Sequence, residues 1–466
     1  MTYTEDRPEA RESQPDTAWG RFAPIVLRLH FYAGLLVGPF LLVAALTGLA
    51  YALVGQVDAA VYRHELTVDS VGSQQLPLSQ QVAAATATQP AGTVTSIRPP
   101  ARPDDSTRIV FATEDVPADY SRTVFVDPYN GEIRGTLTTY GEWLPVRAWF
   151  DELHRNLHLG AFGRNYSELA ASWLWVVALG GLFLWIGYRR RTARLSRIAL
   201  PDRDATPRRR RLTWHGAVGV WIIVGLLALS VTGLTWSRYA GTNIGNITQA
   251  IRPALSTELD PAAAKPMTGH EHHGAAPMPT GEPLAGIDKV LQTVHQAGLR
   301  GPLWMTPPPE PNTAWLVAER KRDLPTQLDT ITVNPSNGQI TGRSNFADWS
   351  LLQKSTEWAI DGHMGILFGI PNQILVALIV IGLITVITRG YLMWWRRRPT
   401  RSGRLPVPPK RGGLLALKPL ELVALALLVI AIGWFTPLLG ISLAAFLAID
   451  LVWGFVAGRR AGASGG

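Results

Sequence analysis

Six blocks of nearly uninterrupted apolar residues constrain this 466-residue chain more than any other feature of its sequence. Each block approaches the ~20 residues that a helix needs to cross the hydrocarbon core of a bilayer. The blocks favour a membrane α-helical bundle of about six transmembrane helices, because a helix satisfies its own backbone groups in lipid. The six predicted spans are residues 25–54, 169–188, 212–236, 366–387, 414–435 and 438–456.

Basic residues predict how these spans are oriented. Arginine and lysine cluster in the loops 189–211 and 389–413, which the positive-inside rule places in the cytoplasm. Six spans then leave both termini in the cytoplasm, if the protein lies in a bacterial cell (inner) membrane. The net charge of +9 sits largely in these loops. Nucleic-acid binding is therefore not expected, since no basic stripe interleaves with aromatic residues.

Two long connections, 55–152 and 237–357, are predicted to lie in the periplasm, and they look alike. Each holds a helix-compatible stretch, two strand-like runs and an Asn-Gly turn, which is a strong hairpin signal. We therefore expect two small α+β modules in a duplicated arrangement of span, module, span. The elements are 77–87, 109–113, 123–126 and the turn 127–135 in the first module, and 286–297, 314–318, 330–333 and the turn 334–343 in the second.

The predicted division of the chain follows from these spans and modules. The first span is expected to remain as an anchor, because it follows a polar stretch of more than twenty residues and lacks a small-residue cleavage site. The parts are a cytoplasmic tail (1–24), helix 1 (25–54), module 1 (55–152), an outer histidine segment with helix 2 (153–188), a basic loop (189–211), helix 3 (212–236), module 2 (237–357), an outer histidine segment with helix 4 (358–388), a basic loop (389–413), helices 5 and 6 (414–458) and a cytoplasmic tail (459–466).

Four histidines stand near the ends of different apolar segments, and the ends alternate along the chain. His30 and His215 are expected near the inner face, and His154 and His363 near the outer face. An ionisable residue in a membrane segment is a functional-site hypothesis by default. Two matched pairs predict axial ligands to the iron of two b-type haems. The absence of cysteine excludes thiolate ligation and covalent attachment of haem.

Glycines beside the inner histidines favour the same hypothesis. Gly34 and Gly219 each follow their histidine by four residues, so they share its helical face and open a slot for a porphyrin. The alternative is that the histidines are only hydrogen-bonding residues between helices. His158 competes with His154 as the outer ligand, because it lies four residues later on the same helical face. A chain break around 160–164 would be needed to fold His154 back toward the membrane.

A second group of histidines, His270, His272 and His273, lies in a stretch rich in Gly, Pro and Ala. Clustered histidines can bind a transition metal, but this spacing fits no closed site. A solvated linker is the preferred interpretation of this stretch.

Four runs of sequence resemble the PepSY-associated membrane protein family, which includes iron-regulated inner-membrane proteins and ferric-siderophore reductases. The runs are RLHFYAGLLVGPFLLVAALTGLAY, LHRNLHLGAFGRN, TWHGAVGVW with VTGLTW, and DGHMGILFGIPNQIL with its MWWRRRP tail. The resemblance covers about residues 20–400. It implies that the inserts are PepSY modules, that His154 fills the LHR position, and that the haem ligands are His30, His154, His215 and His363.

The same resemblance implies a di-haem b protein that passes electrons outward to reduce periplasmic ferric-siderophore and release ferrous iron. No GxGxxG motif follows a predicted strand, and the cytoplasmic loops are too short for a flavin or nicotinamide domain. The electron donor is then a separate reductase or a membrane quinol. The rival hypothesis is a non-enzymatic PepSY membrane sensor or protease-modulating protein without haem. A metal permease is a weaker alternative, because it needs acidic or histidine ligands in the middle of its spans, and these blocks are nearly uninterrupted apolar residues. The last two spans carry no assigned role.

Overall fold

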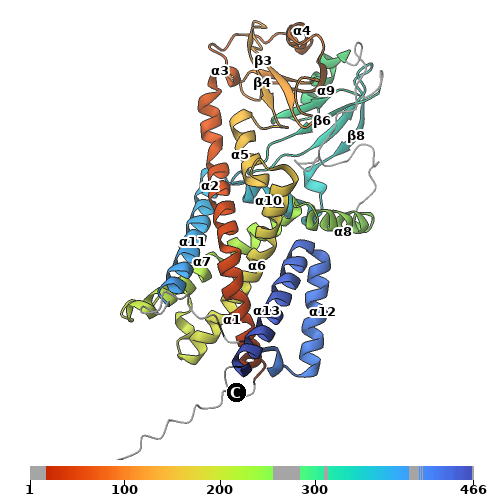
Figure 1. Cartoon of the computed structure of the whole chain (residues 1–466). Helices are drawn as coiled ribbons and strands as arrows, with labels where there is room; N and C mark the ends of the chain where they lie inside the picture. The colour runs from red at the N-terminus through yellow and green to blue at the C-terminus, as the bar shows by residue number, and fades with distance from the viewer. Residues whose placement is uncertain are drawn as a thin grey trace, which may run out of the picture. The chain divides into compact units, whose positions relative to one another are not determined.

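The chain forms two compact units in the computed structural model, which describes residues 17–255, 284–308, 313–397, 409, 411 and 413–463. The helical unit comprises Met1–Ala45, Asn165–Asn243 and Ile381–Gly466. The sheet unit comprises Leu46–Arg164 and Ile244–Val380. Several helices contribute residues to both units (Figure 1).

Five helices in the described part of the chain are long and apolar enough to cross a membrane. The fifth predicted span, 414–435, corresponds to α12 (Pro419–Phe435), which is apolar but has only 17 residues. Five of the six predicted spans therefore correspond to a helix long enough to cross a membrane, and the count of six stays a prediction. The five are α2 (Gly38–Val61), α6 (Gly160–Arg191), α7 (Pro207–Thr235), α11 (Ile370–Trp395) and residues Pro437–Gly454 of α13 (Pro437–Ala463).

The first predicted span is divided near its start. One residue, Val37, separates α1 (Ala18–Leu36) from α2, which begins at Gly38. Pro39, in the first turn of α2, has no backbone N–H and is tolerated at a helix start. The predicted span 25–54 is continuous across this break, although Gly38-Pro39 is a break signal within the apolar run.

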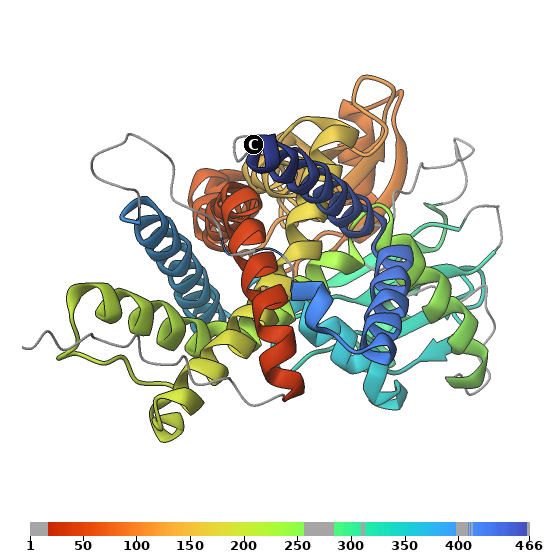
Figure 2. The same cartoon turned by 60° about the horizontal axis from the view of Figure 1, so that its bottom comes forward.

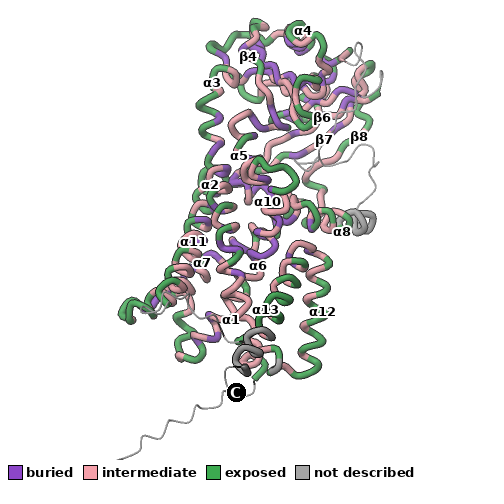
Figure 3. Tube along the Cα trace, in the orientation of Figure 1, coloured by how far each residue is buried: buried purple, intermediate pink, exposed green. Residues whose placement is uncertain are grey.

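The last two helices form a hairpin that is attached to α1. The two helices are drawn in blue in Figure 2. Gly433 and Gly440 let them approach closely, because a Cβ added at Gly440 would lie 2.7 Å from the Gly433 Cα. Helix α12 has no buried residue along its length (Figure 3). Arg21 of α1 pairs with Glu421 at 2.5 Å, and Arg28 pairs with Asp450. These ion pairs link the hairpin to the helix that carries His30.

The strands of both inserts form one antiparallel sheet of eight strands, in the order β4-β3-β2-β1-β5-β6-β7-β8. The sequence predicts two modules but does not predict that their strands join in one sheet. The two halves join where Ile97 of β1 pairs with Met305 of β5. The strands are β1 (Thr93–Arg98), β2 (Thr107–Ala112), β3 (Ser121–Val126), β4 (Ile133–Thr139), β5 (Leu303–Thr306), β6 (Trp315–Glu319), β7 (Thr330–Val333) and β8 (Ile340–Ser344).

Both predicted hairpins are present at the Asn-Gly sequences. Gly131 and Gly338 adopt φ values of 77° and 75°, a backbone conformation that favours glycine. The pairs Val126↔Ile133 and Val333↔Ile340 flank the two turns. The turn residues thus set the register of the strands on either side.

One face of the sheet carries the hydrophobic core. Helices α4 (Leu78–Thr88) and α9 (Ile287–Gln296) contribute to this core, and they lie where the sequence predicts helices. They are joined to each other by Ser79, which donates from its backbone N–H to Asp288 at 3.1 Å. The remaining short elements of the sheet unit are α3 (Arg63–Leu66), α5 (Pro145–Asn156), η3 (Phe346–Asp348) and α10 (Leu351–His363). The short helices η1 (Leu195–Arg197) and η4 (Gly413–Ala416) belong to the helical unit. Helix α8 (Ala240–Leu255) begins in the helical unit.

Replacing Ile97 by alanine should destabilise the joined sheet by about 2–5 kcal/mol, because the change leaves a cavity in a packed core. Ile97 is fully buried and pairs across the junction of the two halves. Ile340→Ala is the matched control, since Ile340 lies on the edge strand β8 and is 42% exposed. Thermal unfolding and limited proteolysis of the purified full chain would measure the difference. Equal stability of the two variants would contradict a single continuous core.

Candidate functional site

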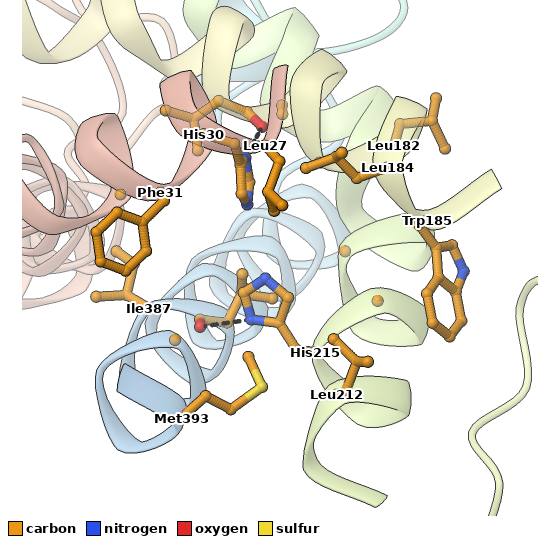
Figure 4. Close-up of a pocket in the computed structure, with 18 of the residues that line it drawn as sticks. Leu27, His30, Phe31, Leu182, Leu184, Trp185, Leu212, His215, Ile387 and Met393 are labelled. Carbon is orange, nitrogen blue, oxygen red and sulfur yellow. Dashed lines mark hydrogen bonds between the residues drawn. The ribbon is translucent and has the colours of Figure 1, made fainter. Parts of the chain in front are cut away.

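The structure brings His30 of α1 and His215 of α7 together in the helical unit. Their ring centres lie 6.3 Å apart, with an angle of 81° between the ring planes. The Nδ1 atom of His30 is 3.0 Å from the carbonyl oxygen of Val177, and that of His215 is 3.0 Å from the carbonyl oxygen of Val386 (Figure 4). A carbonyl accepts only from a protonated Nδ1, so each ring is held with Nε2 as the nitrogen that carries the free electron pair.

Glycines on neighbouring helices make room for the two imidazoles. A Cβ added at Gly181 of α6 would lie 2.9 Å from Cε1 of His30. One added at Gly390 of α11 would lie 3.7 Å from Cε1 of His215. Neither glycine was among the residues predicted from the sequence, although the Gly180-Gly181 pair within an apolar span is a visible signal of close packing.

A cavity of about 670 Å³ adjoins these histidines. Its size is within the ~300–1,000 Å³ typical of small-molecule and cofactor sites. A Cβ added at Gly34 or at Gly219 would meet no atom within 4 Å, so both predicted glycines face open space. The labelled wall in Figure 4 is mainly apolar, and its residues are Leu27, Phe31, Leu182, Leu184, Trp185, Leu212, Ile387 and Met393.

The sheet unit holds a second pair, formed by His154 of α5 and His363 at the end of α10. Their ring centres lie 6.5 Å apart. The Nδ1 atom of His154 is 3.0 Å from the hydroxyl oxygen of Thr47. A Cβ added at Gly48 would lie 2.9 Å from Cε1 of the same ring. This pair therefore repeats two features of the first, a hydrogen bond at Nδ1 and a glycine against the ring.

His158 is separated from this pair by a change of backbone direction. Helix α5 ends at Asn156, and Leu157 and His158 both have a φ of 56° before α6 begins at Gly160. The Nδ1 atom of His158 is 3.2 Å from Glu152, and its ring lies 4.9 Å from that of Trp149. His154, and not His158, is thus beside His363. The break occurs slightly before the predicted range 160–164.

Burial and ion pairs shape the electrostatics around His363. Burial lowers the pKa of His363 to about 3, and His154 adds to the shift, so its imidazole is neutral near pH 7. Asp361 pairs with Arg322 at 2.5 Å, and Arg322 also pairs with Glu142. Burial raises the pKa of Asp361 to about 6, while Arg322 opposes that shift.

Neither pair is part of a larger ligand cluster. No group of three or more His, Cys, Asp or Glu side chains suited to a metal ion occurs in the portion of the chain that is described. A closed zinc site needs four such ligands. A pair of facing imidazoles instead suits a metal whose other ligands come from the bound group itself. The predicted His270–His273 cluster lies outside the described residues.

A family model for the PepSY-associated TM region matches residues 27–397. The match covers most of the chain and contains all four paired histidines, so the chain belongs to the PepSY-associated transmembrane family. A comparison with curated proteins finds no match. Together with the apolar helices, the family identifies a multi-pass membrane protein.

Proposed function

We propose that this protein is a di-haem b oxidoreductase of the bacterial inner membrane, which moves electrons across the membrane to reduce periplasmic ferric-siderophore. The spacing of the two histidine pairs carries the proposal. Two imidazoles that held one metal between them would have ring centres about 6 Å apart, since a metal–nitrogen bond is ~2 Å long. The separations of 6.3 Å and 6.5 Å agree with this arrangement.

The residues present fit haem b as the bound group. His30 and His215 would hold one haem, with Gly34 and Gly219 leaving space beside it. His154 and His363 would hold the other. When bound, each haem supplies an iron that accepts and gives up a single electron.

Groups of the chain itself would fix the orientation and the protonation of these histidine rings. The carbonyl groups of Val177 and Val386 orient the first pair and keep each Nε2 free of a proton. Apolar walls such as Leu27, Phe31 and Ile387 exclude water from the cavity. Exclusion of water lowers the local dielectric constant, and a low dielectric favours the less charged oxidation state of the metal.

The proposed orientation puts both termini and the basic loops 189–211 and 389–413 in the cytoplasm. The eight-stranded sheet would then lie in the periplasm as the family's paired PepSY modules. The electron donor would be a membrane quinol or a separate cytoplasmic reductase. A quinol gives two electrons and two protons as it becomes quinone, and two ferric ions become ferrous. Ferrous iron is held less tightly by hard oxygen chelators, so the metal is released.

The visible spectrum of the detergent-purified protein tests the proposal. We expect about two six-coordinate b haems per chain from the pyridine assay, and bands that respond to dithionite. The reduced protein should then be reoxidised by an added ferric-siderophore. A folded but colourless protein from haem-replete cells would contradict the proposal and would favour a membrane sensor without haem.

A further inference from the structure

The cavity beside His30 and His215 has an apolar wall over most of its length and a basic end. Among the described residues that line it, the arginines or lysines are Arg191 and Arg397, and none is an aspartate or glutamate. Arg191 is the last residue of α6, and Arg397 lies just beyond Trp395, the last residue of α11. Such a cavity fits an amphipathic molecule whose anionic groups lie at one edge.

Each arginine continues the helix face that holds one of the two histidines. Side chains three, four or seven residues apart share one face of a helix. The cavity-lining residues with this spacing are Val177, Gly181, Tyr188 and Arg191 along α6, and Val386, Gly390 and Met393 along α11, with Arg397 next in the same series. At 1.5 Å per residue, Arg191 lies about 15 Å beyond Gly181, and its Cα–Cβ bond tilts back toward the histidines.

These two arginines differ from their neighbours in having no counter-charge within the chain. Three other arginines of the loop 189–211 pair with Asp202, and they are Arg189, Arg194 and Arg209. The guanidinium carbon of Arg190 lies 5.0 Å from the ring centre of Trp19. Arg191 and Arg397 form no ion pair and no side-chain hydrogen bond with a residue that the structure describes. Their charges are therefore available to a molecule in the cavity.

Axial ligation alone does not determine the orientation of a haem. Two imidazoles define one axis through the iron, and the macrocycle can still turn about that axis. The wall of the cavity must therefore select which edge of the ring faces each end. A carboxylate placed against an apolar wall loses its hydration without gaining a partner, so the carboxylate edge is favoured at the basic end.

We propose that Arg191 and Arg397 bind the two propionate groups of the haem held by His30 and His215. Guanidinium groups match the planar oxygen pair of a carboxylate and hold it by charge-assisted hydrogen bonds. The carboxylate edge would then face the loops 189–211 and 389–413, from which a cytoplasmic donor would approach. The inference rests on the proposed function, to which it adds the orientation of this haem and the residues that fix it.

The rate of haem release tests the arginines in the haem-loaded protein. The Arg191→Gln, Arg397→Gln double variant in phosphatidylcholine nanodiscs should release one of its two haems to excess apomyoglobin at least about tenfold faster than the wild type. The other haem should be released at the wild-type rate. Arg190→Gln with Arg396→Gln is the matched control, because it removes the same charge from the same loops at positions that do not line the cavity.

Iron-free protoporphyrin IX separates the carboxylate contacts from ligation of iron by histidine. The porphyrin and its uncharged dimethyl ester would be titrated by fluorescence into the haem-free full chain. We expect the wild type to bind the free acid at least about tenfold more tightly than the ester, and the double variant to bind both alike. Thermal unfolding of the haem-free variants should match the wild type, since both arginines are exposed.

The outcomes distinguish this site from the proposed function. Unchanged haem release by the double variant, or equal binding of acid and ester by the wild type, would overturn the inference. Equally fast release by the control would also overturn it, because the net charge of the loops would then be the cause. An arginine-dependent preference for the free acid in a protein that forms no six-coordinate haem would support this site and contradict the proposed oxidoreductase.

Discussion

Alanine at both His30 and His215 is expected to lower the haem content from about two to about one per chain. The double substitution removes both axial nitrogens from one cavity and leaves the other pair unchanged. The His154→Ala, His363→Ala double variant should lose the other haem to the same extent. Removing both members of a pair avoids a five-coordinate haem, which a single remaining imidazole can still hold.

The pyridine assay and the reduced spectrum would be recorded on each variant at equal protein concentration. His158→Ala combined with His295→Ala is the matched control. His158 is engaged with Glu152, and His295 is at the end of α9 in the sheet unit. Retention of two haems by either paired variant would contradict the assignment of ligands. Loss of haem from the control would show that the effect is not specific to the pairs.

The sequence predicts the broad architecture because the relevant signals are local. Runs of about twenty apolar residues predict spans, and Asn-Gly between alternating runs predicts hairpins. The junction of the two inserts into one sheet is not a local property. Strands β1 and β5 are short, and the polar composition of Thr93–Arg98 shows no clear alternation. The pairing of Ile97 with Met305 and the core shared by both inserts, which lie far apart in the chain, show that the halves join.

The residues of the candidate site also divide into those that the sequence predicts and those that only the structure shows. The four histidines could be chosen from their positions at span ends, and Gly34 and Gly219 from helical spacing. Gly48 and Gly390 could not, because each packs against a histidine of another helix, and the Gly180-Gly181 pair indicates close packing but not contact with His30. The choice between His154 and His158 depends on the backbone. The left-handed conformations at Leu157 and His158 end α5 and turn His158 away, and neither residue type predicts them.

Leucine at Gly219 is expected to abolish binding of the haem held by His30 and His215 while leaving the second haem in place. The added side chain would project into the cavity, since a Cβ at this position would meet no atom within 4 Å. A haem plane needs that space beside its axial ligand, whereas the apoprotein tolerates an apolar side chain in an apolar cavity. The haem content should therefore fall from about two to about one per chain, while the thermal stability of the haem-free protein should not fall. Gly34→Leu should act in the same way from α1.

The control is Val224→Phe, which adds comparable bulk to the same helix at a position that is 77% exposed. Both variants should insert and fold alike, so a difference in haem content reports on the cavity alone. If Gly219→Leu kept two haems, the macrocycle would have to lie elsewhere, even with His30 and His215 as ligands. If Gly219→Leu and Val224→Phe lost haem equally, bulk on α7 would act through helix packing. A selective loss in Gly219→Leu would place the porphyrin in the space beside Gly219, which the histidine substitutions alone cannot do.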